Sequence, residues 1–339
     1  MAVTLRDVAE VAQLSVSTVS RALNRHPNVD AATRALVHRV AREIGYPLER
    51  LRQAAQAQTV LVMGAGAPGA GPAGDSVVGT DFAREVFAGV QTVLEPRGIV
   101  ASLQYRRSET LSGNDLGADP AVLGVILMGG SIDTGFLEEL AAADIPFVIA
   151  GGRPEGASVD SVMADYERGI EAAVAHLAGG GARKIALVNG PARTVTSSEK
   201  YRGFRLGLAL YGLEHDPNRV VAAGDFTPRD GAEITEALLN RCPDVDAIIY
   251  ADDHLAVGGL RVLRALNRRV PSDVSVVGIH DYPVASYAEP PLTTVRFDMQ
   301  QMGRIAAERL LSISRADSRN SDPWSVLIPA PLVVRSSTR

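Results

Sequence analysis

The hydrophobic positions divide the chain into three parts of different character. Residues 1–46 carry apolar side chains at helical spacing, and residues 47–58 form a polar connector rich in Ala and Gln. In residues 59–339, short apolar runs alternate with longer amphipathic stretches, which is typical of a parallel sheet covered by helices. The pattern predicts a small all-α head, a hinge, and an α/β core of two doubly wound parallel-sheet subdomains.

The apolar runs of the core are rich in Val and Ile, as is usual for strands buried on both faces. Strands are expected at 60–63, 100–104, 124–128, 147–150, 185–188, 247–250 and 274–277. Helices are expected between them at 82–94, 135–143, 166–178, 199–210, 231–239 and 255–266. Because ligands of such sheets bind at the carboxyl ends of the strands, a binding site is expected there.

The head pattern predicts three short helices. The first contains apolar residues at i, i+3, i+4 and i+7, namely Leu5, Val8, Ala9 and Ala12. Thr4 and Asp7 resemble a capping box at its start, and Ser15 can cap a second helix over 16–23. Gly45 stands where the third helix is expected to end. A tight turn between the first two helices describes a helix-turn-helix.

The second of these helices is expected to expose a face suited to DNA. Its exposed residues are Ser17, Thr18, Ser20, Arg21 and Asn24. Arginine can bind guanine in a bidentate manner, and Ser and Thr hydroxyls suit phosphates. A solvated helical cap without a DNA partner is the alternative interpretation of this face.

Composition and charge narrow the class of protein. The first 60 residues hold eight Arg against five acidic residues, whereas the whole chain of 339 residues has a formal net charge of -5, so the head is basic and the body acidic. The single cysteine, Cys242, excludes an internal disulfide. Neither a signal peptide nor an apolar run of membrane-spanning length is visible, which predicts a cytoplasmic protein.

The sequence contains no recognisable catalytic motif. Residues 64–69 match G-x-G-x-x-G after a strand, but the Gly and Pro residues that follow favour a loop over the helix that a dinucleotide site needs. The spacing of the six histidines matches no metal motif, and the chain contains neither a nucleophile elbow nor a phosphate-binding lysine loop. We therefore expect no enzyme activity, no cofactor and no metal.

The head sequence TLRDVA at 4–9, followed by LSVSTVSRALN at 14–24, closely resembles the LacI/GalR family of transcription regulators. Segments 160–162, 203–205, 270–278, 290–295 and 332–335 resemble family landmarks in family order. The resemblance implies a periplasmic-binding-protein-like core and a homodimeric repressor that binds a near-palindromic operator and a small effector. A transcriptional activator, or a cytosolic ligand sensor with a weakened hinge, remains an alternative.

The resemblance also assigns DNA contacts. Val16, Ser17 and Arg21 would face bases, and the phosphates would be held by Thr4, Ser15, Thr18, Ser20 and Asn24. In the connector, Ala55 occupies the position where the family has a leucine that wedges into the minor groove. Either a shifted hinge uses Leu51, or the wedge is weaker and Arg50 and Arg52 supply electrostatic contact. A weaker wedge predicts a less constrained operator centre.

The resemblance divides the core into an N subdomain of about 59–160 plus 290–322 and a C subdomain of about 161–289 plus 323–339. Strand ends and family positions together give the candidate effector contacts Asp81, Phe82, Arg153, Tyr166, Arg193, Ser198, Asp252, His280 and Asp281. Polar groups with an aromatic face suit a sugar or sugar derivative. Arg153 and Arg193 raise the alternative of an anionic sugar.

Overall fold

The computed structural model describes residues 4–23, 29, 31–46, 58–65, 77–106, 116, 119, 121–129, 134–154, 156–192, 194–314 and 322–339. Its contacts separate two units, Met1–Gln58 and Thr59–Arg339, which are treated one at a time below. Within the described residues, no helix has both the length and the apolar character that crossing a bilayer requires.

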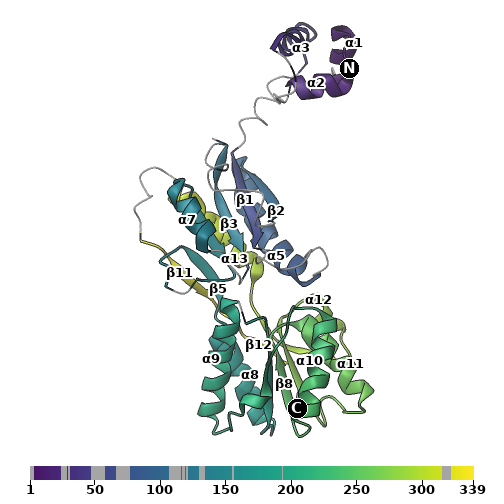
Figure 1. Ribbon diagram of the computed structural model, residues 1–339, viewed down its shortest axis with the longest axis vertical. Coiled ribbons are helices and arrows are strands. Elements are labelled where there is room, and N and C mark those ends of the chain that lie inside the picture. The colour runs from purple at the N-terminus through teal and green to yellow at the C-terminus, as the bar shows by residue number, and fades with distance from the viewer. Residues whose placement is uncertain are drawn as a thin grey trace. The chain divides into compact units, whose positions relative to one another are not determined.

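The first unit is a three-helix head (Figure 1). Its helices are α1 (Leu5–Ala12), α2 (Val16–Leu23) and α3 (Ala31–Glu43). Val8, Val19 and Val37, one from each helix, are fully buried and form the centre of the core. Gln13 adopts a left-handed conformation with φ 54°, which ends α1 and turns the chain into α2. The predicted helix-turn-helix is confirmed.

The second unit contains two sheets, each of six strands among the described residues. The first sheet has the order β11-β5-β4-β3-β1-β2 and is parallel throughout. Its strands are β1 (Thr59–Ala65), β2 (Val100–Arg106), β3 (Val122–Met128), β4 (Phe147–Ala150), β5 (Ser161–Ala164) and β11 (Ser325–Ile328). Its helices are α5 (Val77–Leu94), followed by η1 (Glu95–Arg97), then α7 (Thr134–Ala142) and α13 (Met299–Ile313).

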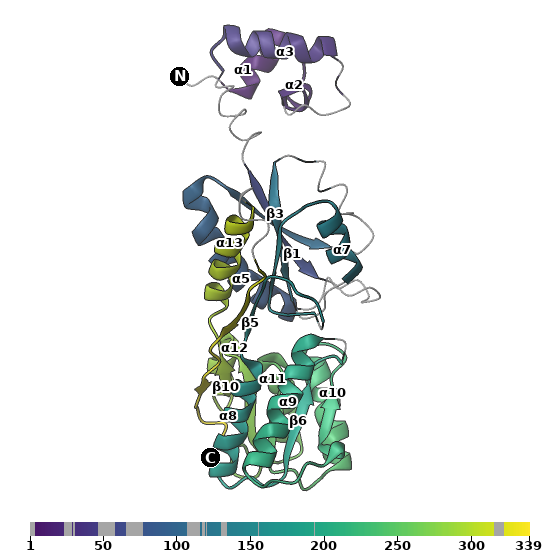
Figure 2. The same ribbon diagram turned by 90° about the vertical axis from the view of Figure 1, so that its left-hand side faces the viewer.

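Both faces of the first sheet are covered. Val60 and Val62 pack with α5 and α13, whereas Leu61 and Met63 pack with α7, as the period of two along a strand requires. Figures 1 and 2 show these helices beside the sheet. α5 and α13 approach closely through glycine, because a Cβ on Gly89 would lie 2.0 Å from the Gln300 carbonyl oxygen.

The second sheet has the order β12-β10-β9-β8-β6-β7, and only its β10–β12 pair is antiparallel. Its strands are β6 (Ile185–Asn189), β7 (Val220–Ala222), β8 (Ala247–Tyr250), β9 (Ser275–His280), β10 (Thr293–Arg296) and β12 (Leu332–Val333). Its helices are α8 (Tyr166–Gly179), α9 (Val195–Leu210), η2 (Pro217–Arg219), α10 (Pro228–Arg241), α11 (Asp253–Ala265) and α12 (Pro283–Tyr287). Ile248 and Tyr250 pack with α10 and α11, and Ile249 packs with α8 and α9.

The strand pairing corrects the predicted subdomain boundaries. β5 and β11 were expected in the C subdomain, but residues 161–164 and 325–328 form a parallel ladder within the first sheet. β10 was expected in the N subdomain, but it pairs with β9 in the second sheet. The chain therefore crosses between the sheets after β5, after β10 and after β11. Below, the N subdomain is the part built on the first sheet, and the C subdomain is the part built on the second.

Two further differences concern individual elements. Helix α13 and the short strands β5, β7, β10, β11 and β12 were not predicted. Gly64 and Ala65, which the pattern assigned to a loop over 64–74, continue β1, and residues 66–74 of the expected loop lie outside the described residues. The fold class of a helix-turn-helix head with two α/β subdomains is confirmed.

Candidate DNA-reading face and effector site

The exposed face of α2 is the candidate DNA-reading face. Ser15 caps the helix, because its Oγ accepts a hydrogen bond from the Thr18 N–H at 3.0 Å. The hydroxyls of Ser17 and Thr18 lie 2.8 Å and 2.7 Å from the same oxygen. Val16, Ser17 and Arg21 are exposed, whereas Thr18 and Ser20 are half-buried. The three residues expected to face bases are therefore accessible on one short helix.

Thr4 already has a partner within the head. Its N–H and its hydroxyl donate to the Asp7 carboxylate at 2.6 Å and 2.8 Å, and these bonds lower the pKa of Asp7. Thr4 and Ser15 therefore organise helix starts, whatever they contribute to phosphate binding. Five predicted DNA contacts lie outside the described residues, namely Asn24, Arg50, Leu51, Arg52 and Ala55.

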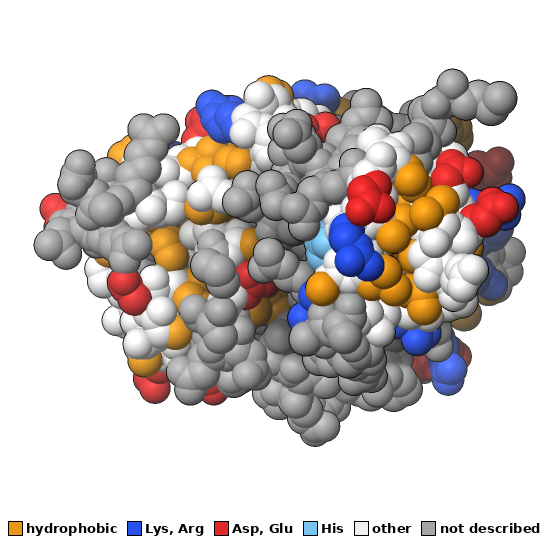
Figure 3. Space-filling view, turned by 90° about the horizontal axis from the view of Figure 1, so that it is seen from above, with side chains coloured by type: hydrophobic (Ala, Val, Ile, Leu, Met, Phe, Trp, Pro, Cys, Tyr) orange, Lys and Arg blue, Asp and Glu red, His pale blue; other side chains and the backbone are white. Residues whose placement is uncertain are grey.

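Charge on the described surface is mixed. Figure 3 shows Lys and Arg side chains interspersed with Asp, Glu and apolar side chains on the face drawn there. The described side chains of that face therefore form no broad patch of one sign.

The core holds a second candidate site, where the carboxyl ends of β8 and β9 meet helix starts. Asp252, 1% exposed, caps α11 by accepting the His254 N–H at 2.7 Å. His254 Nδ1 lies 3.1 Å from Asp252 Oδ1, and His280 Nδ1 lies 3.0 Å from Asp252 Oδ2. Burial alone would raise the pKa of Asp252, but the two imidazoles outweigh it and the pKa falls below its ordinary value. Asp252 is thus an ionised carboxylate shared by two imidazoles.

The neighbouring residue Asp253 connects the elements that carry this site. It is fully buried and accepts hydrogen bonds from the Tyr282 N–H at 2.8 Å and the Thr294 hydroxyl at 2.7 Å. A Cβ on Gly278 would lie 2.2 Å from Asp253 Oδ1, so this carboxyl group needs glycine at that position. Burial raises the pKa of Asp253 well above its ordinary value. Asp253 therefore joins α11, β10 and the turn after β9.

A buried lysine faces the aromatic side of the site. Lys200 is 1% exposed, and its Nζ lies 4.7 Å from the centre of the Tyr166 ring and 5.7 Å from that of Phe226. Burial lowers the pKa of Lys200 to about 8. Phe297 packs its ring against Tyr166 and His280 with centroid distances of 5.5 Å and 5.3 Å. A cation, a carboxylate and aromatic faces are thus combined in one region.

Residues of the N subdomain contact this region directly. Asp81, from α5, lies 3.6 Å from His254 Nε2, measured from its Oδ2. Arg153 follows β4 and lies 3.8 Å from Glu199 of α9, measured between its guanidinium and Oε1. Phe82 packs on Gly151, whose φ of 97° and lack of a Cβ leave room for the ring. The two subdomains are thereby joined by two charged pairs.

The group of residues Asp81, Tyr166, Lys200, Asp252, His254 and His280 is called the junction cluster below. A cavity of about 520 Å³ adjoins it, lined in part by His280, Phe297, Arg84 and Arg296. That volume lies within the range of small-molecule sites. No group of residues suited to metal binding occurs within the described part of the chain.

The predicted effector contacts divide into three groups. Asp81, Phe82, Arg153, Tyr166, Asp252 and His280 lie at or beside the junction. Asp281 lines the adjoining cavity and accepts a hydrogen bond from Arg335 at 2.6 Å, whereas Ser198 is exposed on α9. Arg193 lies outside the described residues. Lys200 and His254 were missed, although Lys200 is one of only two lysines and lies on a helix that follows a strand.

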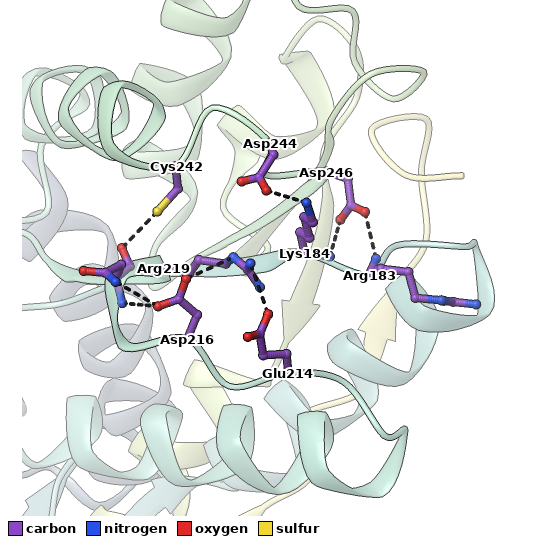
Figure 4. Close-up of polar contacts among 9 residues, drawn as sticks. Arg183, Lys184, Glu214, Asp216, Arg219, Cys242, Asp244 and Asp246 are labelled. Atoms are coloured by element: carbon purple, nitrogen blue, oxygen red, sulfur yellow. Dashed lines mark hydrogen bonds and ion pairs between the residues drawn. The ribbon is translucent and has the colours of Figure 1, made fainter.

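A further polar network lies at the opposite, amino end of the second sheet (Figure 4). Asp246 accepts the backbone N–H groups of Arg183 and Lys184 at 2.8 Å and 2.9 Å, and Arg219 pairs with Glu214 at 3.4 Å. Cys242 is buried there and lies against the Asn218 carbonyl. Because ligands of these sheets bind at the carboxyl ends of strands, we assign this network a structural role.

Comparison with known proteins identifies the head and part of the core. Residues 4–47 match the model for bacterial regulatory proteins of the lacI family, and residues 174–338 match a periplasmic binding protein-like domain. The HTH-type transcriptional regulator CelR of Thermobifida fusca is 36% identical, over 98% of each chain. MalR of Streptomyces coelicolor is 33% identical over 100% of this chain and 97% of its own.

Two solved structures are similar over nearly the whole chain. A complex of the regulator CelR with cellobiose has a TM-score of 0.74 and 33% identity, and 99% of each chain is covered. A lac repressor dimer bound to operator and the anti-inducer ONPF has a TM-score of 0.71 and 25% identity, with 100% of this chain and 99% of that chain covered.

Proposed function

The chain belongs to the lacI family of bacterial regulatory proteins, and from that premise we propose that it is a repressor whose operator affinity is set by a neutral sugar. The protein acts as a homodimer on a near-palindromic operator, with α2 of each head in a major groove. The sugar binds at the junction cluster. One observation supports effector binding at this cluster. The buried cation Lys200 lies between the rings of Tyr166 and Phe226, near the ionised Asp252.

The DNA half rests on the exposed face of α2. Val16 and Arg21 supply an apolar group and a bidentate donor for base edges, and Ser17 supplies a hydroxyl. The lac repressor dimer in its operator complex is a similar protein over the full length of this chain, which supports the same dimeric arrangement here. The hinge hypothesis concerning Ala55 stays a prediction, because residues 47–57 lie outside the described residues.

The effector half favours a neutral sugar over an anionic one. Asp252 and Asp81 present carboxylates that accept sugar hydroxyls but repel an anion. Arg153, the described arginine that suggested an anionic ligand, pairs with Glu199 and donates to Ser325 Oγ at 3.2 Å. Phe297, which lines the adjoining cavity, offers a ring against which a sugar can pack. The similar regulator CelR was solved with cellobiose, a neutral sugar, which supports this choice.

The test begins with selection of binding sites from random duplex DNA by the full-length protein. We expect a two-fold symmetric site whose affinity falls as salt rises, because phosphate contacts release counterions. Operator affinity is then measured with cellobiose and with glucose 6-phosphate. Cellobiose should change the affinity and the phosphate should not. The tolerance of the central base pairs also tests the Ala55 hypothesis.

Matched variants separate the two halves of the proposal. Arg21→Ala should bind the selected operator more weakly and lose specificity at one base pair of each half-site, while cellobiose binding, followed by calorimetry, persists. Lys200→Met should leave selection intact and remove the response to cellobiose. Failure to enrich any sequence would overturn the repressor function, and a response to the phosphate alone would overturn the neutral effector.

A further inference from the structure

The two charged pairs that join the subdomains differ in their dependence on protons. Arg153 and Glu199 form a pair of permanently charged groups at neutral pH. His254 and Asp81 form a pair in which one partner, the imidazole, is charged only when it carries two protons. The second pair therefore joins the subdomains only in one protonation state of His254.

The surroundings of His254 favour that state. Its Nδ1 is 3.1 Å from Asp252 Oδ1 and its Nε2 is 3.6 Å from Asp81 Oδ2, so each ring nitrogen faces a carboxylate. The ring also packs on Tyr282 with a centroid distance of 5.2 Å, and Arg84 lies 3.1 Å from the other oxygen of Asp81. Burial lowers the pKa of His254, but the carboxylates outweigh it and the net shift is upward.

Loss of one proton would reverse the contact with Asp81. A neutral imidazole has one N–H, and the shorter distance to Asp252 keeps that hydrogen on Nδ1. The lone pair of Nε2 would then face the Asp81 carboxylate across 3.6 Å, so attraction becomes repulsion. The pair is thus a switch rather than a weak permanent bridge.

We propose that His254 and Asp81 form a proton-dependent latch that holds the N and C subdomains together. Since the joined state raises the pKa of His254, the latch is complete below the pKa of a free histidine and is lost as pH rises through the raised value. Separation of α5 from α11 is coupled to release of a proton. This goes beyond the proposed function and requires no ligand.

Other groups near the junction titrate in or near the same range, but on the C subdomain alone. Lys200 lies on α9 and faces Tyr166, and His280 ends β9 and faces Asp252. Neither forms a charged pair with Asp81 among the described residues. Substitution of Asp81 therefore removes the latch and leaves these groups in place.

The test measures the distance between the subdomains directly. Nitroxide labels are attached at Glu138→Cys on α7 and Glu236→Cys on α10, both exposed, while the native Cys242 is buried. Distance distributions are recorded by pulsed electron resonance at pH 6 and pH 8.5 without ligand. We expect the labelled protein to gain a second population at pH 8.5. Asp81→Asn should show the pH 8.5 distribution at both pH values.

Glu85→Gln is the matched control, because it neutralises a carboxylate of the same helix that binds Arg84 and Gln300 instead of a histidine. It should keep the pH response of the parent. A second readout is the pKa of His254 from NMR, which should fall in Asp81→Asn because one of the two facing carboxylates is removed. A distribution that ignores pH in the parent, or a parental pH response in Asp81→Asn, would overturn the latch.

Discussion

The face of α2 and the junction cluster both consist of polar side chains, but they hold them in opposite states. On α2, Ser17 and Arg21 are exposed to solvent at the surface of a short helix. At the junction, Asp252 and Lys200 are each 1% exposed and are surrounded by groups of the protein itself. The first region therefore gains binding energy by adding a partner, whereas the second must rearrange contacts that exist before any ligand arrives.

This difference explains how one chain can combine DNA binding with response to a ligand. Exposed groups can be exchanged with little cost to the fold, so a recognition face is easily retuned. Buried groups that share partners across two subdomains couple any ligand to the arrangement of those subdomains. Substitutions should then act on stability in the core and on DNA affinity in the head.

The largest expected effect is loss of stability on Asp253→Ala. The substitution leaves the Tyr282 N–H and the Thr294 hydroxyl buried without an acceptor. Unfolding by urea should show a loss of about 3 kcal/mol. The control is Asp298→Ala, which removes an exposed cap that accepts the Gln301 N–H at 2.7 Å and should cost about 1 kcal/mol. Equal losses in the two variants would contradict the comparison.

The sequence predicted the head more completely than the core, because the head is specified by local signals and the core by pairing between distant segments. Turn, cap and helix spacing at residues 4–23 are local signals, and each helix of the head was found where the pattern placed it. β5, β10 and β11 are four-residue strands whose sheet depends on partners up to 164 positions away in sequence, such as Ser161 and Ser325. No local pattern specifies that choice.

Arg21 gives the next effect in size, and it falls on DNA affinity rather than on stability. If its guanidinium binds a base edge in a bidentate manner, Arg21→Ala costs about 1–3 kcal/mol, or roughly 5- to 150-fold, and relaxes specificity at one base pair of each half-site. Fluorescence anisotropy with single-base operator variants measures this.

Arg21→Lys separates base contact from phosphate contact at the same position. Lysine keeps the charge but not the planar pair of donors. Arg21→Lys should therefore lose specificity almost as fully as Arg21→Ala. If it binds all operator variants as the parent does, Arg21 contacts a phosphate and the assignment to bases is wrong.

Lys200→Met, unlike the Arg21 variants, should change stability and not DNA specificity. The fold should become more stable and the response to the effector weaker. Because burial lowers the pKa of Lys200 to about 8, the folded state disfavours the ammonium, and stability should rise with pH between about 8 and the ordinary lysine value. At pH 7, removal of this charge should stabilise the core by about 1–2 kcal/mol. By pH 9.5 most of that gain should be gone, as urea unfolding at both pH values will measure.

Lys184→Met is the matched control, since the chain has only these two lysines. The side chain of Lys184 is 45% exposed and pairs with Asp244 (Figure 4), so its loss should change stability by less than about 1 kcal/mol. A Lys200→Met core that is less stable than the parent at pH 7 would show that the contacts with Tyr166 and Phe226 outweigh burial.

The site was predicted in part because residues at strand ends can be found from sequence, whereas the phase of a helix is harder to determine. Ser198 was chosen on α9, but Gly203 fixes the phase of this helix, because a Cβ there would lie 2.3 Å from the Glu167 carbonyl oxygen. Lys200, three positions before Gly203, therefore faces inward and Ser198 outward. The pairing of Asp281 with Arg335 spans 54 positions and has no local signal.

The smallest expected effect concerns Ser15, a residue of the head whose hydroxyl already has partners within the protein, as the polar groups of the core do. Its Oγ accepts the Thr18 N–H, so Ser15→Ala should lower the stability of the head by about 1 kcal/mol. Ser15→Asp restores an acceptor at the helix start and should recover stability, as circular dichroism melts will show.

The same variant tests whether Ser15 contacts DNA, because an aspartate beside the DNA backbone would repel phosphate. If Ser15 only caps the helix, Ser15→Asp binds operator like the parent, and if it also contacts phosphate, as the resemblance implies, operator affinity falls while the head stays folded. We expect the second outcome, which would place Ser15 between the two regions, because one hydroxyl then stabilises the fold as the core groups do and binds DNA as the rest of α2 does.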